Sequence, residues 1–396
     1  MSDTVLVLNS GSSSIKFGLF DISATEPGLV CKGLLDEHEA RPRLVVRSPA
    51  GEDLFETRRE AADADGGHLF ADVLAFIEDR FGERSLRAVG HRVVHGGRDY
   101  SGPVVLSDAV TAKLEALTPL APLHQPRCLA PVRTLAAIRP ALTQIACFDT
   151  AFHHAIAPPA SRFAIPRRFE ERGIRRYGFH GLSFEYVAGR LAQIAPELIA
   201  KRSVIAHLGN GASLCALRDG RSIDTTMGLT PLDGLVMGTR CGTIDPGVLL
   251  YLQQHEKMSL EDVQHLLYHE SGLFGVSGLS ADMRTLLASS TEAAREAVDL
   301  FTFRAAQAIV MMATTLGGLD CLVFTGGIGE HAEEIRSAIG ERLGWLGVRI
   351  DAAANEETRE RISRDDSAVD VLVIPTNEEL TIARHCAALI RGRDVT

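Results

Sequence analysis

Two arginines lie beside glycine turns, where their guanidinium groups could bind an anion. Arg92 lies within residues 91–97 (HRVVHGG), and Arg240 lies within residues 237–242 (MGTRCG). Arginine binds carboxylate or phosphate bidentately, and a buried arginine without such a partner is costly. A structural salt bridge is the commoner explanation for either arginine alone. A chemistry that moves a phosphoryl group to a carboxylate would need cations from two directions, because both reactants are anions.

Three turns rich in glycine and small polar residues could hold phosphate groups. They span residues 9–14 (NSGSSS), 209–213 (GNGAS) and 325–330 (TGGIGE). Gly11 and Gly211 would let backbone N–H groups approach an anionic ligand. Any one of these segments could be an ordinary β-turn. The three together favour phosphate and nucleotide binding.

Single polar residues stand in otherwise apolar settings. Asp149 follows the apolar run 142–148, and His180 lies within residues 177–181 (YGFHG). The carboxyl end of a strand is where ligand sites of α/β proteins usually form, which favours a role for Asp149. A lone histidine is more often a core or surface residue than a catalyst. We leave His153 in that ordinary class.

Acidic residues near the C-terminus could hold a metal ion. Glu378, in residues 375–379 (PTNEE), offers oxygen ligands suited to Mg²⁺. The preference of helix N-termini for acidic residues would explain it equally well. Asp282 and Arg284 follow the glycine-punctuated residues 272–278, which we describe as a mobile loop.

The elements that must position these residues alternate between strands and helices, which indicates an α/β protein. Residues 5–20 are typical of a hairpin, and residues 204–217 repeat its shape. The pair favours an internal duplication of the fold, although chance hairpins are common and give an equal alternative. In the first hairpin, alternation places Lys16 on the face opposite Ile15 and Phe17.

Other elements follow from periodicity and from proline content. Residues 119–131 hold four prolines and are predicted to be largely non-helical. A domain boundary is expected near residue 150. The remaining helices are expected at 66–81, 251–268, 291–316, 332–343 and 380–390, and the remaining strands at 88–90, 142–148 and 371–374.

Length and composition exclude several classes of protein. The 396 residues suggest two or three domains, and a net charge of −10 argues against nucleic-acid binding. Seven cysteines without metal spacing are expected to be reduced thiols, and the N-terminus lacks the pattern of a signal peptide. The longest uncharged helical stretch, residues 305–319, is too short to span a membrane. These features predict a cytoplasmic protein.

Several common catalytic motifs are missing from the sequence. It holds no P-loop signature, no complete G-x-G-x-x-G, no G-x-S-x-G and no H-E-x-x-H. The usual nucleotide, hydrolase and metalloprotease interpretations therefore lose their main support.

Taken together, the motifs resemble those of the acetate kinase family, within the acetate and sugar kinase/Hsp70/actin superfamily. They occur in family order and span nearly the whole chain. They are residues 8–16 (LNSGSSSIK), 90–97 (GHRVVHGG), 148–153 (FDTAFH), 176–181 (RYGFHG), 207–211 (HLGNG), 237–242 (MGTRCG), 324–330 (FTGGIGE) and 376–379 (TNEE).

The resemblance implies an α/β, two-domain actin-like ATPase fold with duplicated ribonuclease-H-like cores and an interdomain cleft. The domains would be residues 1–150 and 151–379, with a C-terminal helix at 380–396 packing back on the first domain. It implies reversible, in-line transfer of the ATP γ-phosphoryl group to acetate, which gives acetyl phosphate and ADP. It also implies Mg²⁺, which Mn²⁺ can replace, and a homodimer.

The resemblance also assigns roles to residues. Arg92 and Arg240 would bind the carboxylate and the phosphoryl group, His180 would hydrogen-bond that group, and Asp149 would position substrate or metal. Asn9 and Glu378 would hold Mg²⁺. The acetate methyl group would lie among Val94, Leu123, Phe179 and Pro231. The nucleotide would contact Ser12, Lys16, His207, Leu208, Gly209, Asn210, Gly211, Asp282, Met283, Arg284, Gly327, Ile328, Gly329 and His331.

Three positions depart from the family pattern. Gln125 and His331 stand where asparagine is common, and Phe184 stands where histidine is common. Gln125 could alter the entrance of the acyl pocket, and His331, at the adenine end, leaves the nucleotide preference open. A propionate or other short-chain acyl kinase is the nearest rival, and Val94 favours the smaller substrate. The alternative from another functional class is a non-metabolic ATPase of the same superfamily.

Overall fold

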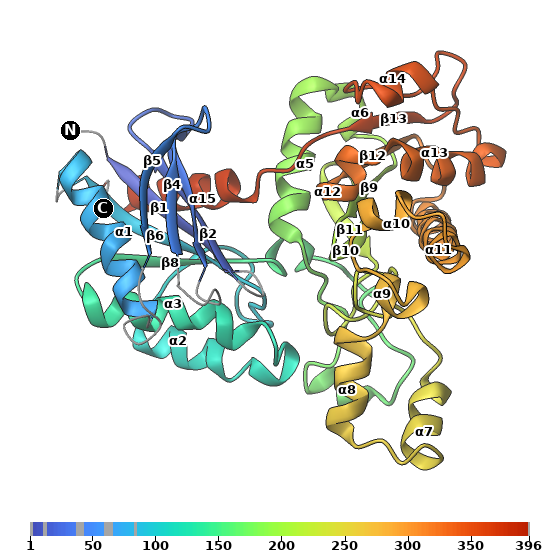
Figure 1. Ribbon diagram of the computed structural model, residues 1–396, viewed down its shortest axis with the longest axis horizontal. Coiled ribbons are helices and arrows are strands. Elements are labelled where there is room, and N and C mark those ends of the chain that lie inside the picture. The colour runs from blue at the N-terminus through green and yellow to red at the C-terminus, as the bar shows by residue number, and fades with distance from the viewer. Residues whose placement is uncertain (1–2, 11–13, 37–42, 59–65, 83–84, 395–396) are drawn as a thin grey trace. The chain divides into compact units, whose positions relative to one another are not determined.

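The chain divides into two compact units that each contain one β-sheet. The structure is a computed structural model that describes residues 3–10, 14–36, 43–58, 66–82 and 85–394. Unit 1 comprises Met1–Ala151 together with Asn377–Thr396, and unit 2 comprises Phe152–Thr376. The N-terminal strand and the C-terminal helix therefore belong to the same unit (Figure 1).

The sheet of unit 1 has eight described strands in the order β5-β4-β3-β2-β1-β6-β8-β7. The pairs β1–β2 and β2–β3 are antiparallel, whereas β1–β6 and β6–β8 are parallel. The strands are β1 (Thr4–Ser10), β2 (Ser14–Asp21), β3 (Gly28–Asp36), β4 (Arg43–Arg47), β5 (Asp53–Arg58), β6 (Leu86–Val93), β7 (Val104–Val105) and β8 (Thr143–Phe148).

The sheet of unit 2 repeats the central arrangement. Its order is β11-β10-β9-β12-β13, with antiparallel β11–β10 and β10–β9 pairs and parallel β9–β12 and β12–β13 pairs. Strands β3-β2-β1-β6-β8 of unit 1 have the same order and directions, which supports the duplication that the two hairpins indicated. The strands are β9 (Ser203–Leu208), β10 (Ala212–Arg218), β11 (Arg221–Thr225), β12 (Cys321–Thr325) and β13 (Asp370–Val373).

Helices cover both faces of the unit 1 sheet. Val89 packs in one apolar cluster with residues of α1 (Gly66–Phe81) and α3 (Gln125–Ile138). The next residue, Gly90, points to the opposite face, where a Cβ would lie 2.6 Å from the Sγ of Cys386 in α15 (Glu378–Asp394). Glycine at this position therefore lets the C-terminal helix approach β6 closely.

The unit 2 sheet is covered in the same way. Cys215 and Leu217 of β10 pack in one cluster with buried residues of α5 (Gly181–Ile194). On the other face, Thr315 near the end of α11 (Glu292–Leu316) donates to Asp224 of β11 at 2.8 Å. The remaining described helices are α2 (Asp108–Glu115), α4 (Arg167–Glu171), α6 (Pro196–Ile199), α7 (Pro246–Gln254), α8 (Leu260–His269), α9 (Gly272–Ser277), α10 (Met283–Leu287), α12 (Gly326–His331), α13 (Glu333–Arg342) and α14 (Ala352–Glu356).

One prediction from proline content was wrong. Residues 125–131 are helical, because they begin α3. Pro126 lies in the first turn, where the missing N–H group is not needed. Pro131 lies inside the helix, and burial of the apolar face that includes Leu129 and Val132 outweighs the lost hydrogen bond.

Three further segments differ from their predictions. The segment 272–278, described from the sequence as a mobile loop, forms the short helix α9. The third glycine turn, 325–330, is mostly the helix α12. The helix predicted at 251–268 is two helices, α7 and α8, separated at Lys257, where φ is +57°.

The uncharged stretch 305–319 was expected to be too short to span a membrane, but the whole helix α11, with its charged N-terminal residues, is long and apolar enough to do so by length and composition alone. In the structure, 44% of the residues in its most apolar window are buried, and the helix packs against β9, β10 and α13. A helix buried in a protein core meets the same length and composition test.

Candidate active site

A polar cluster in unit 1 lies where three neighbouring parallel strands end. Asn9 is the second-last residue of β1, Arg92 is the second-last residue of β6, and Asp149 follows β8 directly. Strands β1, β6 and β8 are parallel and adjacent, so their carboxyl ends meet at one edge of the sheet. This edge is where ligand sites of open α/β sheets form.

The Arg92 guanidinium holds this cluster together. Its Nη2 donates to Asp149 Oδ2 at 2.6 Å, its Nε donates to Asp149 Oδ1 at 3.0 Å, and its Nη1 donates to Asn9 Oδ1 at 3.1 Å. Burial opposes the charge of Arg92, but the carboxylates of Asp149 and Glu378 outweigh it and raise the Arg92 pKa well above its usual value. The arginine is therefore a fixed, oriented cation.

Glu378 brings a second carboxylate to the cluster from the first turn of α15. Its Oε2 accepts from Asn9 Nδ2 at 3.3 Å and lies 3.8 Å from Arg92 Nε. Burial raises the pKa of Glu378, Arg92 opposes this, and repulsion from Asp149 and Glu379 adds to it. The helix dipole alone explains an acidic residue here, but the contact with Asn9 also ties Glu378 to the cluster.

Asn9 and Glu378, the residues predicted to bind metal, have the right chemistry for Mg²⁺. They offer amide and carboxylate oxygens, and Mg²⁺ usually takes one or two protein carboxylates while phosphates and waters supply its other ligands. Among the described residues, no group of three or more His, Cys, Asp or Glu could hold a metal ion. The cluster thus fits a metal that arrives with nucleotide phosphates.

Lys16, Val94 and Leu123, also predicted site residues of unit 1, lie in described segments. Lys16 is exposed on β2 and is paired with Asn9 in the β1–β2 register, so the two side chains share a face. Val94 is buried and Leu123 is half-buried. Ser12 lies outside the described residues, so its role stays a prediction.

Gln125 lies in the first turn of α3 and contacts the backbone after β6. Its side chain is fully buried, its Oε1 accepts from the His95 backbone N–H at 3.1 Å, and its Nε2 donates to the carbonyls of His95 and Leu114 at 3.0 Å each. The glutamine side chain, which is longer than the asparagine common in the family, therefore holds the backbone of His95, just after Val94, through two hydrogen bonds. The effect of Gln125 on the acyl pocket stays a prediction from the resemblance.

His180 is the central polar residue of unit 2, and its backbone is constrained. It lies at the N-terminus of α5 with φ +59°, in the left-handed region that non-glycine residues rarely adopt. The preceding carbonyl, of Phe179, is 3.0 Å from His153 Nε2, and His153 Nδ1 is 2.7 Å from Ser222 Oγ. The buried His153 thus fixes the turn that presents His180, which the sequence did not indicate.

His180 and Arg240 meet at the tip of the β9–β10 hairpin. A Cβ added at Gly211 would lie 2.6 Å from Arg240 Nη2 and 3.1 Å from His180 Nε2. Arg240 Nη1 donates to the carbonyl of Pro231 at 2.6 Å. Glycine at the tip therefore lets Arg240 Nη2 and His180 Nε2 approach the hairpin backbone closely.

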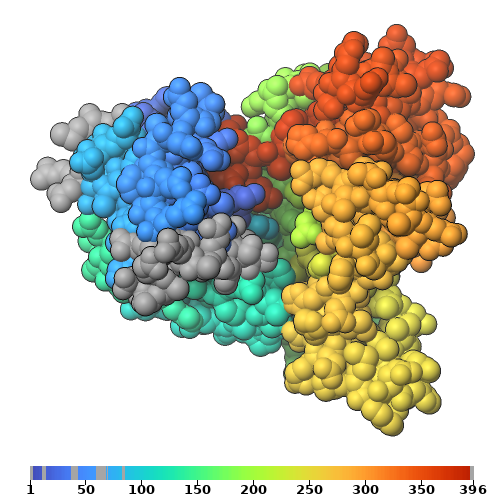
Figure 2. All heavy atoms as spheres, in the orientation of Figure 1, coloured from blue at the N-terminus to red at the C-terminus, as the bar shows by residue number. Residues whose placement is uncertain are grey.

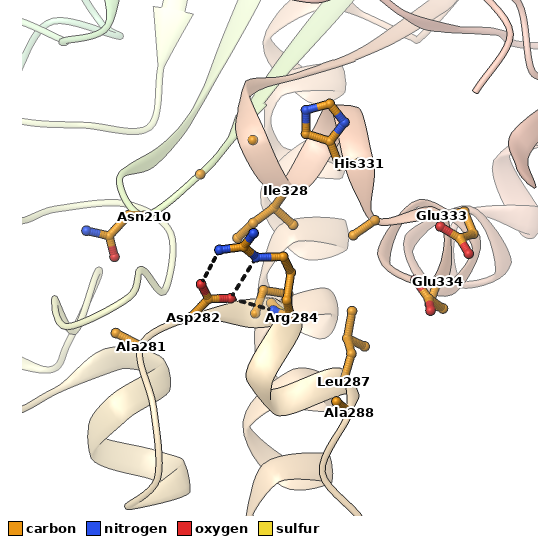
Figure 3. A pocket seen from close by; sticks show the side chains of 14 residues that line it. Asn210, Ala281, Asp282, Arg284, Leu287, Ala288, Ile328, His331, Glu333 and Glu334 are labelled. Atoms are coloured by element: carbon orange, nitrogen blue, oxygen red, sulfur yellow. Dashed lines mark hydrogen bonds and ion pairs between the residues drawn. The ribbon is translucent and has the colours of Figure 1, made fainter. Parts of the chain in front are cut away.

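A cavity of about 830 Å³ lies next to this tip, within the range that ligand sites occupy. Figure 3 shows its wall, with the Asp282–Arg284 pair on one side and His331 on another. Fourteen residues line it. Eight of them are predicted nucleotide contacts: Gly209, Asn210, Asp282, Met283, Arg284, Gly327, Ile328 and His331.

The Asp282–Arg284 pair at the cavity wall is well ordered by hydrogen bonds. Arg284 Nη2 donates to Asp282 Oδ2 at 2.7 Å, and Asp282 Oδ1 accepts from the Arg284 backbone N–H at 2.8 Å. These bonds lower the pKa of Asp282 to about 2. The Arg284 side chain is 90% exposed, so it is accessible at the rim.

Four predicted contacts do not line the cavity but lie on the elements that border it: His207, Leu208, Gly211 and Gly329.

Helix α12, which carries Gly327 and His331, is anchored at its C-terminal end. The fully buried Arg336 donates from Nη1 to the carbonyls of Gly329 at 3.0 Å and Glu330 at 2.9 Å. Arg336 therefore supports one wall of the cavity.

The four residues predicted for the acetate methyl group are divided between the units. Val94 and Leu123 belong to unit 1, and Phe179 and Pro231 belong to unit 2, where both are buried. The acyl pocket stays a prediction from the resemblance.

Phe184, the third departure, is fully buried in α5. Its ring packs edge-on against His153, with centroids 5.4 Å apart, and against His207, with centroids 6.3 Å apart. It therefore fills the space between two histidines that support the His180 region.

Comparison with known proteins places these features in a family. A model of the acetokinase family matches residues 4–384. The acetate kinase of Rhodopseudomonas palustris (strain TIE-1) is 51% identical over 398 residues, covering 99% of this chain and 100% of the relative. The acetate kinase of Methylocella silvestris is 47% identical and covers 98% of both chains.

Two solved structures match over nearly the whole chain. A propionate kinase from Francisella tularensis has a TM-score of 0.90 and 37% identity, covering 97% of this chain and 98% of its own. An acetate kinase from Porphyromonas gingivalis has a TM-score of 0.86 and 34% identity, covering 98% and 100%. These matches confirm the predicted α/β, actin-like ATPase fold.

Proposed function

The chain belongs to the acetokinase family and phosphorylates acetate with ATP, and we propose that it does so by direct in-line transfer of the γ-phosphoryl group. One observation carries the mechanism. Arg240 Nη2, a hydrogen-bond donor, and the ring nitrogen His180 Nε2 lie together at the Gly211 tip beside the cavity of about 830 Å³. The tip offers what a transferring phosphoryl group requires, and the cavity has room for a nucleoside.

The reaction needs alignment and charge neutralisation more than proton transfer. A carboxylate is already a nucleophile, so no general base must remove a proton before it attacks phosphorus. Charge on the phosphoryl oxygens must be stabilised instead, and preorganised donors do this well. This explains why the predicted site contains two arginines and a hydrogen-bonding histidine instead of a catalytic base.

Each polar side chain then has a defined task. Arg240 and His180 donate to the phosphoryl oxygens in the transition state. Arg92 binds the acetate carboxylate, and Asp149 holds the guanidinium in its orientation through the bidentate contact. Asn210 and Gly211 hold the nucleotide phosphates.

The family implies ATP and a divalent metal, and we propose Mg²⁺, with Mn²⁺ able to replace it. Asn9 and Glu378 would hold the ion, which when bound neutralises charge on the nucleotide phosphates. The contact between Asn9 Nδ2 and Glu378 Oε2 at 3.3 Å keeps these two ligands together.

We also propose that the enzyme acts in the cytoplasm as a homodimer. All seven cysteines are free thiols and six are buried, which suits a reducing compartment. Helix α7, which lies at the surface in the yellow segment of Figure 2, exposes apolar side chains, with Leu250 55% and Tyr251 54% exposed. Sedimentation analysis tests the dimer, and a monomer at all concentrations would contradict it.

A hydroxamate assay tests the function and separates it from the nearest rival. The purified enzyme is incubated with ATP, Mg²⁺ and acetate, propionate or butyrate, and acyl phosphate is trapped with hydroxylamine. We expect the highest kcat/KM with acetate and a lower but measurable value with propionate, because one methylene changes binding by about 1–3 kcal/mol. A clear preference for propionate, as the name of the Francisella relative would suggest, contradicts the proposal.

A further inference from the structure

Two histidines of unit 2 form a stacked pair beside the tip of the β9–β10 hairpin. The rings of His180 and His207 have centroids 4.4 Å apart and planes inclined by 21°. A Cβ at Gly209 would lie 3.8 Å from His207 Nε2, and a Cβ at Gly211 would lie 3.1 Å from His180 Nε2. The Nε2 atoms of both rings therefore lie beside the glycines of the tip.

A buried serine hydroxyl holds each ring at its other nitrogen. His180 Nδ1 is 2.9 Å from Ser213 Oγ, and His207 Nδ1 is 2.8 Å from Ser183 Oγ. Both serines are fully buried. Ser213 is directly opposite His207 in the antiparallel β9–β10 register, so the two side chains share one face of the sheet.

The hydroxyl of Thr376 sets the direction of the hydrogen bond between Ser183 and His207. Thr376 Oγ1 donates to Ser183 Oγ at 2.8 Å, which leaves the hydrogen of Ser183 to donate to His207 Nδ1. A neutral imidazole whose Nδ1 accepts a hydrogen bond carries its proton on Nε2. If Ser213 donates in the same way, His180 also carries its proton on Nε2.

We propose that Ser213 and Ser183 are positioning residues that hold His180 and His207 as stacked Nε2–H tautomers, so that both rings donate to phosphoryl oxygens at the hairpin tip. This inference rests on the role proposed above for His180. Loss of a serine hydroxyl would let the proton move to Nδ1. Nε2 would then be an acceptor, which repels a phosphoryl oxygen.

The stacked geometry adds a reason for this control. Two cationic rings at a centroid distance of 4.4 Å would repel each other, so the stack favours at least one neutral ring. A neutral ring donates from Nε2 only in one of its two tautomers. The serine contacts therefore decide whether a neutral histidine in this pair can act as a donor.

The first test measures the tautomers in the wild-type enzyme without any substitution. Nitrogen NMR of histidine-labelled protein distinguishes a protonated ring nitrogen from an unprotonated one by chemical shift. We expect His180 and His207 each to show protonated Nε2 and unprotonated Nδ1. An Nδ1–H tautomer at His180 would overturn the proposal, whatever the variants do.

The second test removes each hydroxyl. Ser213→Ala and Ser183→Ala are small changes, and we expect kcat for acetyl phosphate to fall about tenfold or more in each, as outer-shell substitutions typically do. KM for acetate should change by less than about twofold, because the loss falls on the transition state. Ser213→Thr, which keeps the hydroxyl, should recover activity relative to Ser213→Ala.

Ser203→Ala is the matched control. Ser203 is equally buried on the adjacent strand β9, and its hydroxyl donates to the Leu198 carbonyl at 3.2 Å. This variant should keep wild-type kcat. Equal kcat in Ser213→Ala and Ser203→Ala, alongside an inactive His180→Ala, would overturn the serine proposal and leave the role of His180 intact. A wild-type enzyme that forms no acyl phosphate would instead overturn the proposed function.

Discussion

The two units share a strand order but surround their cationic groups differently. In unit 1, Arg92 is paired bidentately with Asp149 and lies 3.8 Å from Glu378. In unit 2, Arg240 donates to a neutral backbone carbonyl, and His180 contacts a serine hydroxyl. The first arrangement pairs its cation with carboxylates, whereas the second holds its arginine through a backbone carbonyl.

This difference indicates that duplicated folds can carry different electrostatic tasks at corresponding edges. A cation that is already paired is oriented, but its attraction for another anion is reduced. A guanidinium held by a backbone carbonyl keeps a stronger attraction for an incoming anion than one bonded to a carboxylate. We therefore expect the Arg240–His180 tip to stabilise the phosphoryl group, which gains most charge, and Arg92 to orient the less demanding carboxylate.

Removal of Arg240 should have the largest effect. In Arg240→Ala we expect kcat for acetyl phosphate formation to fall by about 10³-fold, as for other arginines that neutralise a transferring phosphoryl group. The hydroxamate assay measures this loss. Arg304→Ala, at an exposed position of α11 in the same unit, is the control and should keep kcat nearly unchanged. Full acyl phosphate formation by Arg240→Ala would show that the tip does not act on the phosphoryl group.

Asp149→Asn should remove the carboxylate that compensates the charge of Arg92 in unit 1. The substitution keeps the shape but removes the charge that faces a largely buried guanidinium. We expect a loss of about 3 kcal/mol in the free energy of unfolding, measured by urea denaturation. We also expect kcat/KM for acetate to fall by about 10²-fold, because Arg92 loses its orientation. Unchanged stability with wild-type kcat/KM would refute the paired-cation interpretation.

Acid should weaken both units through buried neutral histidines. Burial lowers the pKa of His91 in unit 1 and of His153 in unit 2 from 6.5 to about 4. Between pH 4 and pH 6.5, each of these histidines binds a proton in the unfolded chain but stays neutral in the folded chain. Stability is therefore fully present above pH 6.5 and is lost as pH falls toward 4, by up to about 1.4 kcal/mol per pH unit for each histidine.

Urea unfolding across this pH range measures the loss in the free energy of unfolding. Single substitutions show how much of that loss comes from the histidine of each unit. His91→Gln and His153→Gln should each flatten the dependence by about one histidine's share. Exposed His255→Gln is the control and should leave the slope unchanged. An identical slope in wild type and in both buried-site variants would show that these groups titrate normally.

Val94→Ala should have the smallest effect and bears on substrate size. The smaller side chain should raise kcat/KM for propionate relative to acetate by about tenfold, since one methylene is worth about 1–3 kcal/mol. The hydroxamate assay with both acids measures the ratio. A ratio equal to that of the wild type would mean that Val94 does not contact the acyl group.

Much of the fold followed from local pattern. The hairpins around residues 9–14 and 209–213 were predictable because apolar alternation and small polar turns are local signals. Helix α3 was missed because Pro131 argues against a helix locally, while the packing of Leu129 and Val132 is a tertiary effect. Periodicity cannot report such packing.

The predicted site residues were identified by motif order, but their supporting groups were not. Ser213 and Ser183 carry no sequence signal, because their contacts depend on the β9–β10 register and on the left-handed backbone at His180. His153 was set aside as an ordinary core histidine, and its bond to the Phe179 carbonyl emerged only from the structure. The burial of Gln125 also came from the structure, because burial cannot be read from one substitution.

The central claim is that the Gly211 tip, Arg240 and His180 form one phosphoryl site, and Gly211→Ala tests it most directly. The added Cβ would lie 2.6 Å from Arg240 Nη2 and 3.1 Å from His180 Nε2, so it displaces both groups without removing either. Gly189→Ala, in the same unit and with open space around its Cβ, is the matched control. We predict that kcat for acetyl phosphate falls by about 10²-fold in Gly211→Ala and stays at the wild-type value in Gly189→Ala. Wild-type kcat in a folded Gly211→Ala enzyme would contradict the account.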